Sequence, residues 1–202
     1  MAELLRTHPL EGWRTAFERL PDTVGIAVEP FVAMVDVRLG TVGPESSAAL
    51  GVDLPAAPNT WVPAGTGRAV WLGPDEWLLT STTEAPEDLE SRVRAAVLPL
   101  GGSATDVSAQ RIGLRLTGAR VRDVLAKGCS VDLHPRVFGR GSSAQTLLGQ
   151  AGVVLLAPSD AGDDVVVLVR SSFAGYLADW LLDAALEFTP TPTPTPAPTP
   201  TH

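Results

Sequence analysis

The same order of strand-like and helix-like segments occurs twice in this 202-residue chain, and this repetition restricts the possible fold more than any other feature. Each half is predicted as strand, helix, strand, strand, helix. The predicted elements of the first half are a strand at 31–39, a weak helix at 46–50, a hairpin at 69–81 and a helix at 86–98. Those of the second half are a strand at 112–116, a helix at 119–127, hairpin strands at 145–157 and 164–170, and a helix at 173–187. Helices on one face of mainly antiparallel strands give an α+β fold of two related halves, residues 1–103 and 104–188.

Hydrophobic spacing supports these assignments. Apolar and polar residues alternate from Val35 to Leu39, which is the period of a half-buried strand. Leu89, Val93 and Val97 recur at helical spacing, and a serine at 171 or 172 is the expected cap of the last helix. The sequence GVDLP at 51–55 is echoed by SVDLHP at 130–135, each after a predicted helix, which favours a duplication.

The hairpin at 69–81 has a strong turn signal. Its corner is Gly-Pro-Asp-Glu at 73–76, where the proline fixes the first turn angle. Trp71 and Trp77 flank this corner. We expect them to pack into the core, and the alternative is an exposed aromatic surface beside Asp75 and Glu76 that binds another protein.

The last segment differs in composition from the rest. From residue 189 to 202 the sequence is almost pure Thr-Pro alternation, which removes half of the backbone donors and fixes φ at every second residue. This pattern predicts an extended or disordered tail that acts as a spacer. The alternative is a docking peptide for a proline-recognising partner.

Apolar runs and cysteine usage exclude several classes of protein. The longest apolar run, 152–157, is far shorter than a bilayer span, and residues 1–20 lack the apolar core of a secretion signal. One cysteine cannot form an internal disulfide, and one cysteine with three histidines offers no set of soft ligands for zinc. We therefore expect a cytoplasmic protein with no membrane association and no structural metal.

Charge is distributed unevenly along the chain. The net charge of −8 argues against nucleic-acid binding. The stretch 111–140 nevertheless has seven basic residues against Asp123 and Asp132, a local charge of +5 that leaves −13 elsewhere. A solvated basic face is the usual explanation, and an anion-binding or nucleic-acid-binding module is disfavoured. We expect this stretch, including Arg120 and Arg122, to face an acidic surface of a larger partner.

Catalytic signatures are scarce. The sequence contains no P-loop, no hydrolase nucleophile elbow and no H-E-x-x-H zinc motif. The segment 139–144 fits G-x-G-x-x-[GA], but a dinucleotide site requires a strand before it and a helix after it, whereas a strand is predicted after it. We therefore predict no cofactor-binding residues on this chain.

A thiol, a carboxylate and an imidazole occur close together at Cys129, Asp132 and His134. They could form a catalytic Cys–His pair. We favour a structural turn held by hydrogen bonds of Asp132 and His134, with Cys129 packed as a small apolar group after the glycine that ends a helix. No catalytic or metal-binding residue is then expected.

Taken together, these motifs resemble the gamma subunit of heterotetrameric sarcosine oxidase over residues 31–186. The resemblance rests on WLGPDEWLL at 71–79, TDVS at 105–108, GAR at 118–120, LAKGCSVDLHP at 125–135 followed by Phe138, AQT at 144–146 and RSSFA at 170–174. Ser143 stands where this family usually has a second cysteine, which puts a thiol function there in doubt.

The resemblance implies an aminomethyltransferase-like fold and a non-catalytic subunit that stabilises an enzyme complex. That complex oxidatively demethylates sarcosine to glycine, transfers the one-carbon unit to tetrahydrofolate and produces peroxide. FAD, FMN, NAD, tetrahydrofolate and zinc would belong to the alpha, beta and delta subunits. No cofactor is expected on this chain.

The alternative is a stand-alone folate-dependent aminomethyltransferase-like or folate-binding protein that uses Asp106 as the carboxylate near the pterin. Its difficulty is length, since the glycine-cleavage aminomethyltransferases have a further β-rich domain and only the Thr-Pro tail follows residue 187 here.

Overall fold

The structure is a computed structural model that describes residues 7–189. It contains two five-stranded antiparallel sheets, which we call the first sheet, in the order β3-β4-β5-β2-β6, and the second sheet, in the order β1-β7-β10-β9-β8. The strands are β1 Gly25–Val28, β2 Ala33–Arg38, β3 Trp61–Ala64, β4 Gly67–Gly73, β5 Glu76–Ser81, β6 Ser103–Asp106, β7 Arg111–Thr117, β8 Ser143–Leu148, β9 Ala151–Leu156 and β10 Asp164–Arg170. The α-helices are α1 Arg14–Phe17, α2 Pro44–Leu50, α3 Pro86–Val97, α4 Val121–Ala126 and α5 Ala174–Ala185. Short 3-10 turns flank them at η1 Glu11–Trp13, η2 Asp22–Val24, η3 Leu98–Leu100, η4 Ser171–Phe173 and η5 Leu186–Phe188. The predicted Thr-Pro tail lies, except for Thr189, outside the described residues.

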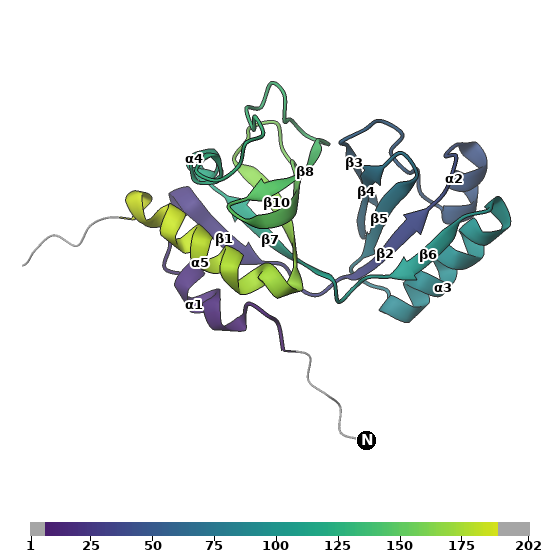
Figure 1. The fold of residues 1–202 in the computed structure, drawn as a ribbon, viewed down its shortest axis with the longest axis horizontal. Helices are drawn as coiled ribbons and strands as arrows, with labels where there is room; N and C mark the ends of the chain where they lie inside the picture. The colour runs from purple at the N-terminus through teal and green to yellow at the C-terminus, as the bar shows by residue number, and fades with distance from the viewer. Residues whose placement is uncertain (1–6, 190–202) are drawn as a thin grey trace, which may run out of the picture.

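The molecule has four layers, with the sheets in the middle and the helices outside (Figure 1). Helices α2 and α3 cover the outer face of the first sheet, where Leu89, Val93 and Val97 of α3 share a cluster with Val35 and Val37 of β2. Helices α1, α4 and α5 cover the outer face of the second sheet in a larger cluster. This arrangement confirms the predicted α+β class.

The inner faces of the two sheets contact each other through a third apolar cluster. It joins Met34, Val70, Leu72 and Leu78 of the first sheet to Val154, Leu156, Val166 and Leu168 of the second. Because β9 and β10 are thus covered on both faces, their sequences are nearly continuous apolar runs rather than alternating ones.

The two halves follow the same order but have two more strands each than predicted, which are β1 and β3 in the first half and β6 and β8 in the second. The order is β2-α2-β3-β4-β5-α3 in the first half and β7-α4-β8-β9-β10-α5 in the second, and the strand positions within the two sheets correspond. The segment 145–157, predicted as one strand, belongs to the hairpin of β8 and β9, which turns at Gly149 and Gln150. Gly149 has a φ of 59°, which explains why a glycine stands at this turn. The single-strand prediction was therefore wrong.

Two short strands pair with the sheet of the opposite half. Strand β1 precedes β2 in sequence but pairs with β7, and β6 precedes β7 but pairs with β2. The sheets therefore exchange strands across residue 103, and the division into units 1–103 and 104–188 stays a prediction. The expected serine cap of the last helix is also absent: α5 follows the turn η4, and Phe173 stands at its N-terminal boundary without a side-chain cap.

Candidate functional site

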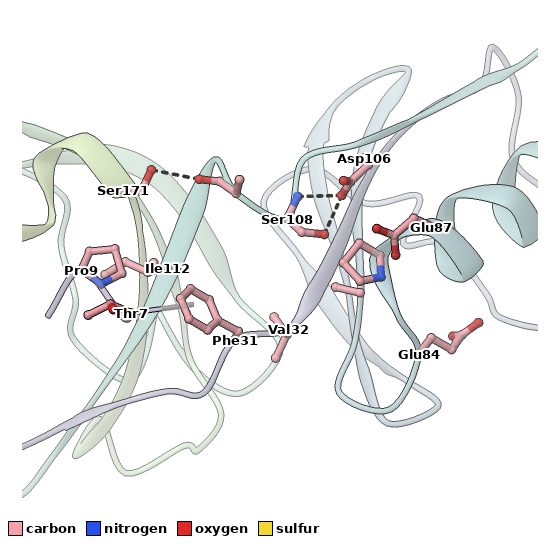
Figure 2. A pocket seen from close by; sticks show the side chains of 13 residues that line it. Thr7, Pro9, Phe31, Val32, Glu84, Glu87, Asp106, Ser108, Ile112 and Ser171 are labelled. Atoms are coloured by element: carbon pink, nitrogen blue, oxygen red, sulfur yellow. Dashed lines mark hydrogen bonds between the residues drawn. The ribbon is translucent and has the colours of Figure 1, made fainter. Parts of the chain in front are cut away.

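The first candidate ligand site is a groove of about 540 Å³ where the chain crosses between the two sheets. Figure 2 shows Asp106, Ser108, Glu84 and Glu87 on one side of it and residues near the N-terminus, such as Pro9, on the other. Strand β6 pairs with β2 in the first sheet and ends at Asp106, where the chain begins to cross to the second sheet.

The carboxylate of Asp106 is engaged by its own turn. Oδ1 of Asp106 accepts hydrogen bonds from the backbone N–H of Ser108 at 2.9 Å and from the Ser108 hydroxyl at 2.6 Å (Figure 2). The Ser108 Oγ in turn accepts the backbone N–H of Met34 at 2.9 Å. Asp106 therefore fixes the crossing segment against β2, which is a structural task that needs no ligand.

The groove is acidic. Its described lining includes Glu84, Glu87 and Asp106 but no arginine or lysine. Arg92 reaches Glu84 from α3 with two hydrogen bonds, of 2.8 and 2.9 Å, and this pairing chiefly lowers the pKa of the Glu84 carboxyl. An anionic ligand, such as a folate with its glutamate carboxylates, finds no cation among these lining residues.

A second polar region lies at the edge of the contact between the sheets. Arg38 of β2 pairs with Glu76 at 2.8 Å and lies 3.6 Å from Asp36. Burial, and then the neighbouring Asp36, raise the pKa of Glu76. Arg111 of β7 reaches the same region from the second sheet. Burial, and then the charge of Arg170, lower the pKa of its guanidinium, and the charges of Asp36 and Glu76 partly oppose this shift.

The alternation from Val35 to Leu39 puts Asp36 and Arg38 on the polar side of a half-buried strand, and it did not predict that Arg111 meets them there. The alternation of charged and apolar residues was the available signal. It indicates a contact between the sheets only once the second sheet is known to pack over that side of the strand.

The predicted turn at 129–134 is confirmed. Oδ1 of Asp132 accepts the backbone N–H of His134 at 2.8 Å, and Nδ1 of His134 accepts the backbone N–H of Arg136 at 3.2 Å. Cys129 is a half-buried free thiol packed against the cluster under α5. The three side chains therefore stabilise and pack a loop, as expected.

The glycine-rich segment 139–144 leads into the strand β8 and not into a helix. It therefore lacks the helix N-terminus on which a dinucleotide phosphate would sit, and the strand predicted after it is confirmed. Within residues 7–189 no group of three or more histidine, cysteine or acidic side chains could hold a metal ion. None of the helices in that part of the chain is long and apolar enough to cross a membrane.

The two tryptophans of the hairpin lie opposite each other on β4 and β5. Trp77 is fully buried, and its indole N–H donates to the carbonyl of Pro55 at 2.8 Å. Trp71 is half-buried against the same cluster. The expectation that these tryptophans pack into the core is confirmed for Trp77.

The basic stretch 111–140 is partly neutralised within the chain. Arg115 pairs with Asp164, Arg120 with Asp123, and Lys127 with Glu187. Three of its seven cations thus have internal partners, so the net charge of the segment overstates the field that it presents. The prediction that Arg120 and Arg122 meet a partner stays a prediction.

Comparison with known proteins gives consistent results. A family model described as the sarcosine oxidase, gamma subunit family matches residues 41–187. The sarcosine oxidase subunit gamma of Corynebacterium sp. (strain U-96) is 39% identical over 144 residues, which cover 71% of this chain and 68% of the relative. That of Arthrobacter sp is 38% identical over 168 residues and 80% of each chain.

Solved structures show the same likeness. A chain of heterotetrameric sarcosine oxidase from Corynebacterium sp. U-96, in complex with pyrrole 2-carboxylate, superposes with a TM-score of 0.80 at 33% identity, over 94% of this chain and 99% of that one. The glycine cleavage system aminomethyltransferase T from Bartonella henselae gives a TM-score of 0.55 at 14% identity, over 83% of this chain and 48% of that one. The second likeness concerns the fold alone.

Proposed function

This chain belongs to the sarcosine oxidase gamma subunit family, and on that premise we propose that it is the non-catalytic gamma subunit of a heterotetrameric sarcosine oxidase. Its partners would be the alpha, beta and delta subunits. The complex would oxidatively demethylate sarcosine to glycine, pass the one-carbon unit to tetrahydrofolate and reduce oxygen to peroxide. We place it in the cytoplasm.

The observation that carries this proposal is the extent of the structural match. The likeness to the heterotetrameric enzyme covers 94% of this chain and 99% of the matched chain, so the fold corresponds almost from end to end. FAD, FMN, NAD, tetrahydrofolate and zinc would then be bound by the other subunits. The polar clusters of the described chain support this assignment, since the turn at Asp132 and His134 and the turn at Asp106 and Ser108 use their hydrogen bonds to hold loops.

The test is co-expression of this chain with the alpha, beta and delta subunits of the same organism. We expect one copy of each to co-elute in size-exclusion chromatography. The isolated chain should be colourless and produce no peroxide with sarcosine. Flavin absorbance or turnover by the isolated chain would overturn the proposal.

The stand-alone folate-dependent alternative predicts that tetrahydrofolate binds in the acidic groove, and the proposed function predicts that it does not. Under the proposed function, titration of the isolated chain with tetrahydrofolate, followed by tryptophan fluorescence, should show no saturable binding, for wild type and Asp106→Ala alike. Saturable binding that is lost in Asp106→Ala would favour the folate-binding alternative.

A further inference from the structure

Two arginines lie directly opposite each other on neighbouring strands of the second sheet. Arg111 begins β7 and Arg170 ends β10, and the two residues are register partners in the antiparallel ladder. Side chains at such positions leave the sheet on the same side, about 5 Å apart at Cβ, and like charges there destabilise the pair. A negatively charged group bound between the two arginines would offset this cost in folding free energy.

That partner is not found within the described part of the chain. Neither Arg111 nor Arg170 has an ion pair there, although Arg38, Arg68, Arg92 and many others do. Burial, and then the charge of Arg170, lower the pKa of the Arg111 guanidinium.

The nearest acids are already engaged. Asp36 and Glu76 of the first sheet form ion pairs with Arg38. They interact electrostatically with Arg111 but form no ion pair with it. Arg170 is exposed and is left as the surplus cation of this region.

The arginines line a groove of about 310 Å³ that crosses β8, β9 and β10. Gly152 of β9 forms part of its lining, and a side chain added at this glycine would meet nothing within 4 Å. Gln145 borders the groove and is held in place, since its amide nitrogen donates to the carbonyl of Leu72 at 2.6 Å. The groove is therefore open at Gly152 and has one border held by a hydrogen bond at Gln145.

One aromatic side chain lines the rim of this groove, and a second packs beside it. Phe173 lines it with 43% of its surface exposed, and Tyr176, 39% exposed, makes an edge-to-face contact with Phe173 at 6.4 Å between centroids. The Tyr176 hydroxyl accepts the backbone N–H of Gln150 at the β8–β9 turn, so this ring is anchored to the sheet. Arginine and aromatic residues are the types enriched at protein interfaces and at their energetic centres.

We propose that this arginine–aromatic groove, lined by Arg111, Arg170, Gly152, Gln145 and Phe173 and flanked by Tyr176 beside Phe173, is a docking site for a carboxylate-bearing segment of a partner subunit. An aspartate or glutamate side chain of that segment lies between the two guanidinium groups and offsets their repulsion. Apolar atoms of the same segment cover Phe173 and Tyr176. The inference rests on the proposed function, because it requires partner subunits.

Charge complementarity decides the kind of occupant. The two arginines of the groove select for a carboxylate. The chain as a whole has a net charge of −8, so the remaining surfaces of two copies of this chain would repel each other. Arginine pairs bind a carboxylate in planar, two-point geometry, which gives register as well as affinity.

Two variants test the groove by independent means, and a third controls for charge. Arg170→Glu reverses the charge. Gly152→Leu fills the hollow, and the open space around Gly152 and its ordinary strand conformation let the variant fold. Arg19→Glu makes the same charge change on an exposed residue that follows α1 and does not line the groove. Each variant is checked by its melting temperature and then bound to the purified alpha–beta–delta assembly over a range of salt concentrations.

We expect Arg170→Glu to raise the dissociation constant at least about tenfold and to remove part of its salt dependence. Gly152→Leu should weaken binding to a similar extent, and Arg19→Glu should bind within about twofold of wild type. A further variant, Arg170→Lys, supplies an amine that a carbodiimide joins to a neighbouring carboxyl group. Mass spectrometry of the complex should then find residue 170 linked to an acidic residue of a partner subunit.

Three outcomes would overturn the inference. If wild type assembles with the partners and both groove variants bind equally well, the docking site is wrong and the proposed function stands. If residue 170 links only to a second copy of this chain, the occupant is wrong. If wild type itself does not bind the other subunits, the proposed function fails and this inference fails with it.

Discussion

Removing the arginine of the ion pair that joins the two sheets should lower the free energy of unfolding more than breaking a surface ion pair of this chain does. Arg68 of β4 donates two hydrogen bonds to Glu29, which follows β1, at 2.6 and 3.0 Å. The pair thus joins the first sheet to an exchanged strand of the second. Its side chains are only 24% and 15% exposed.

The expected magnitude follows from this burial. Removal of one partner from a fully buried pair costs about 3–5 kcal/mol, because the other charge is left without compensation. Partial access of water to Arg68 and Glu29 reduces the cost, so we expect Arg68→Ala to lose about 2–3 kcal/mol. For a chain of this size that corresponds to a fall of about 5–10 °C in melting temperature.

The assay is thermal unfolding followed by tryptophan fluorescence, in a double-mutant cycle. Arg68→Met combined with Glu29→Met should recover most of the loss, since no unpaired charge remains. The control is Arg115→Ala, which breaks another two-hydrogen-bond pair, with Asp164, but at a residue 51% exposed, and should cost less than about 1 kcal/mol. If the double variant loses the sum of the losses that Arg68→Met and Glu29→Met show singly, the pair does not couple the sheets and the reasoning is refuted.

Three further outcomes follow from the packing. Gly113→Ala should destabilise the protein by about 2 kcal/mol, measured by urea unfolding, because the new Cβ would collide with the paired carboxylate of Glu29; a neutral effect would contradict the close approach. Trp77→Phe should cost about 1–3 kcal/mol in the same assay, since the buried carbonyl of Pro55 loses its donor, and an unchanged midpoint would argue against that bond. Burial, and then the charge of Arg14, lower the pKa of His8, so the unfolded chain binds more protons below its ordinary pKa of about 6.5 and stability should fall as the pH drops through that value. His8→Phe should flatten this slope, and a slope equal to that of wild type would show that another group causes it.

The sequence predicted the elements well where hydrophobic period and turn chemistry agree. The strand at 31–39, the hairpin around residues 73–76 and the helix at 86–98 all occur close to the expected bounds. The hairpin of β8 and β9 was missed, although Gly149 marks its turn, because apolar residues continue on both sides of the glycine. Burial of β9 on both faces erases the alternation that would mark where this strand begins.

Pairing partners were beyond sequence reasoning. Strands β1 and β6 have four residues each, and nothing local to them says that each joins the sheet of the other half. For the same reason the Arg111–Arg170 pair could not be predicted, since it exists only through the register of β7 with β10. The loop function of Asp132 and His134 was predictable because it depends on neighbours in sequence.

The central claim, that this chain supports an enzyme complex without contributing a catalytic group, is tested by titrating it into the purified alpha, beta and delta subunits. Peroxide production with sarcosine is measured per flavin, together with the half-life of the activity at elevated temperature. The account predicts that turnover per flavin stays constant while the half-life lengthens until one equivalent has been added. Turnover per flavin that rises in proportion to the added chain, with flavin content and the size of the other three subunits unchanged, would contradict it.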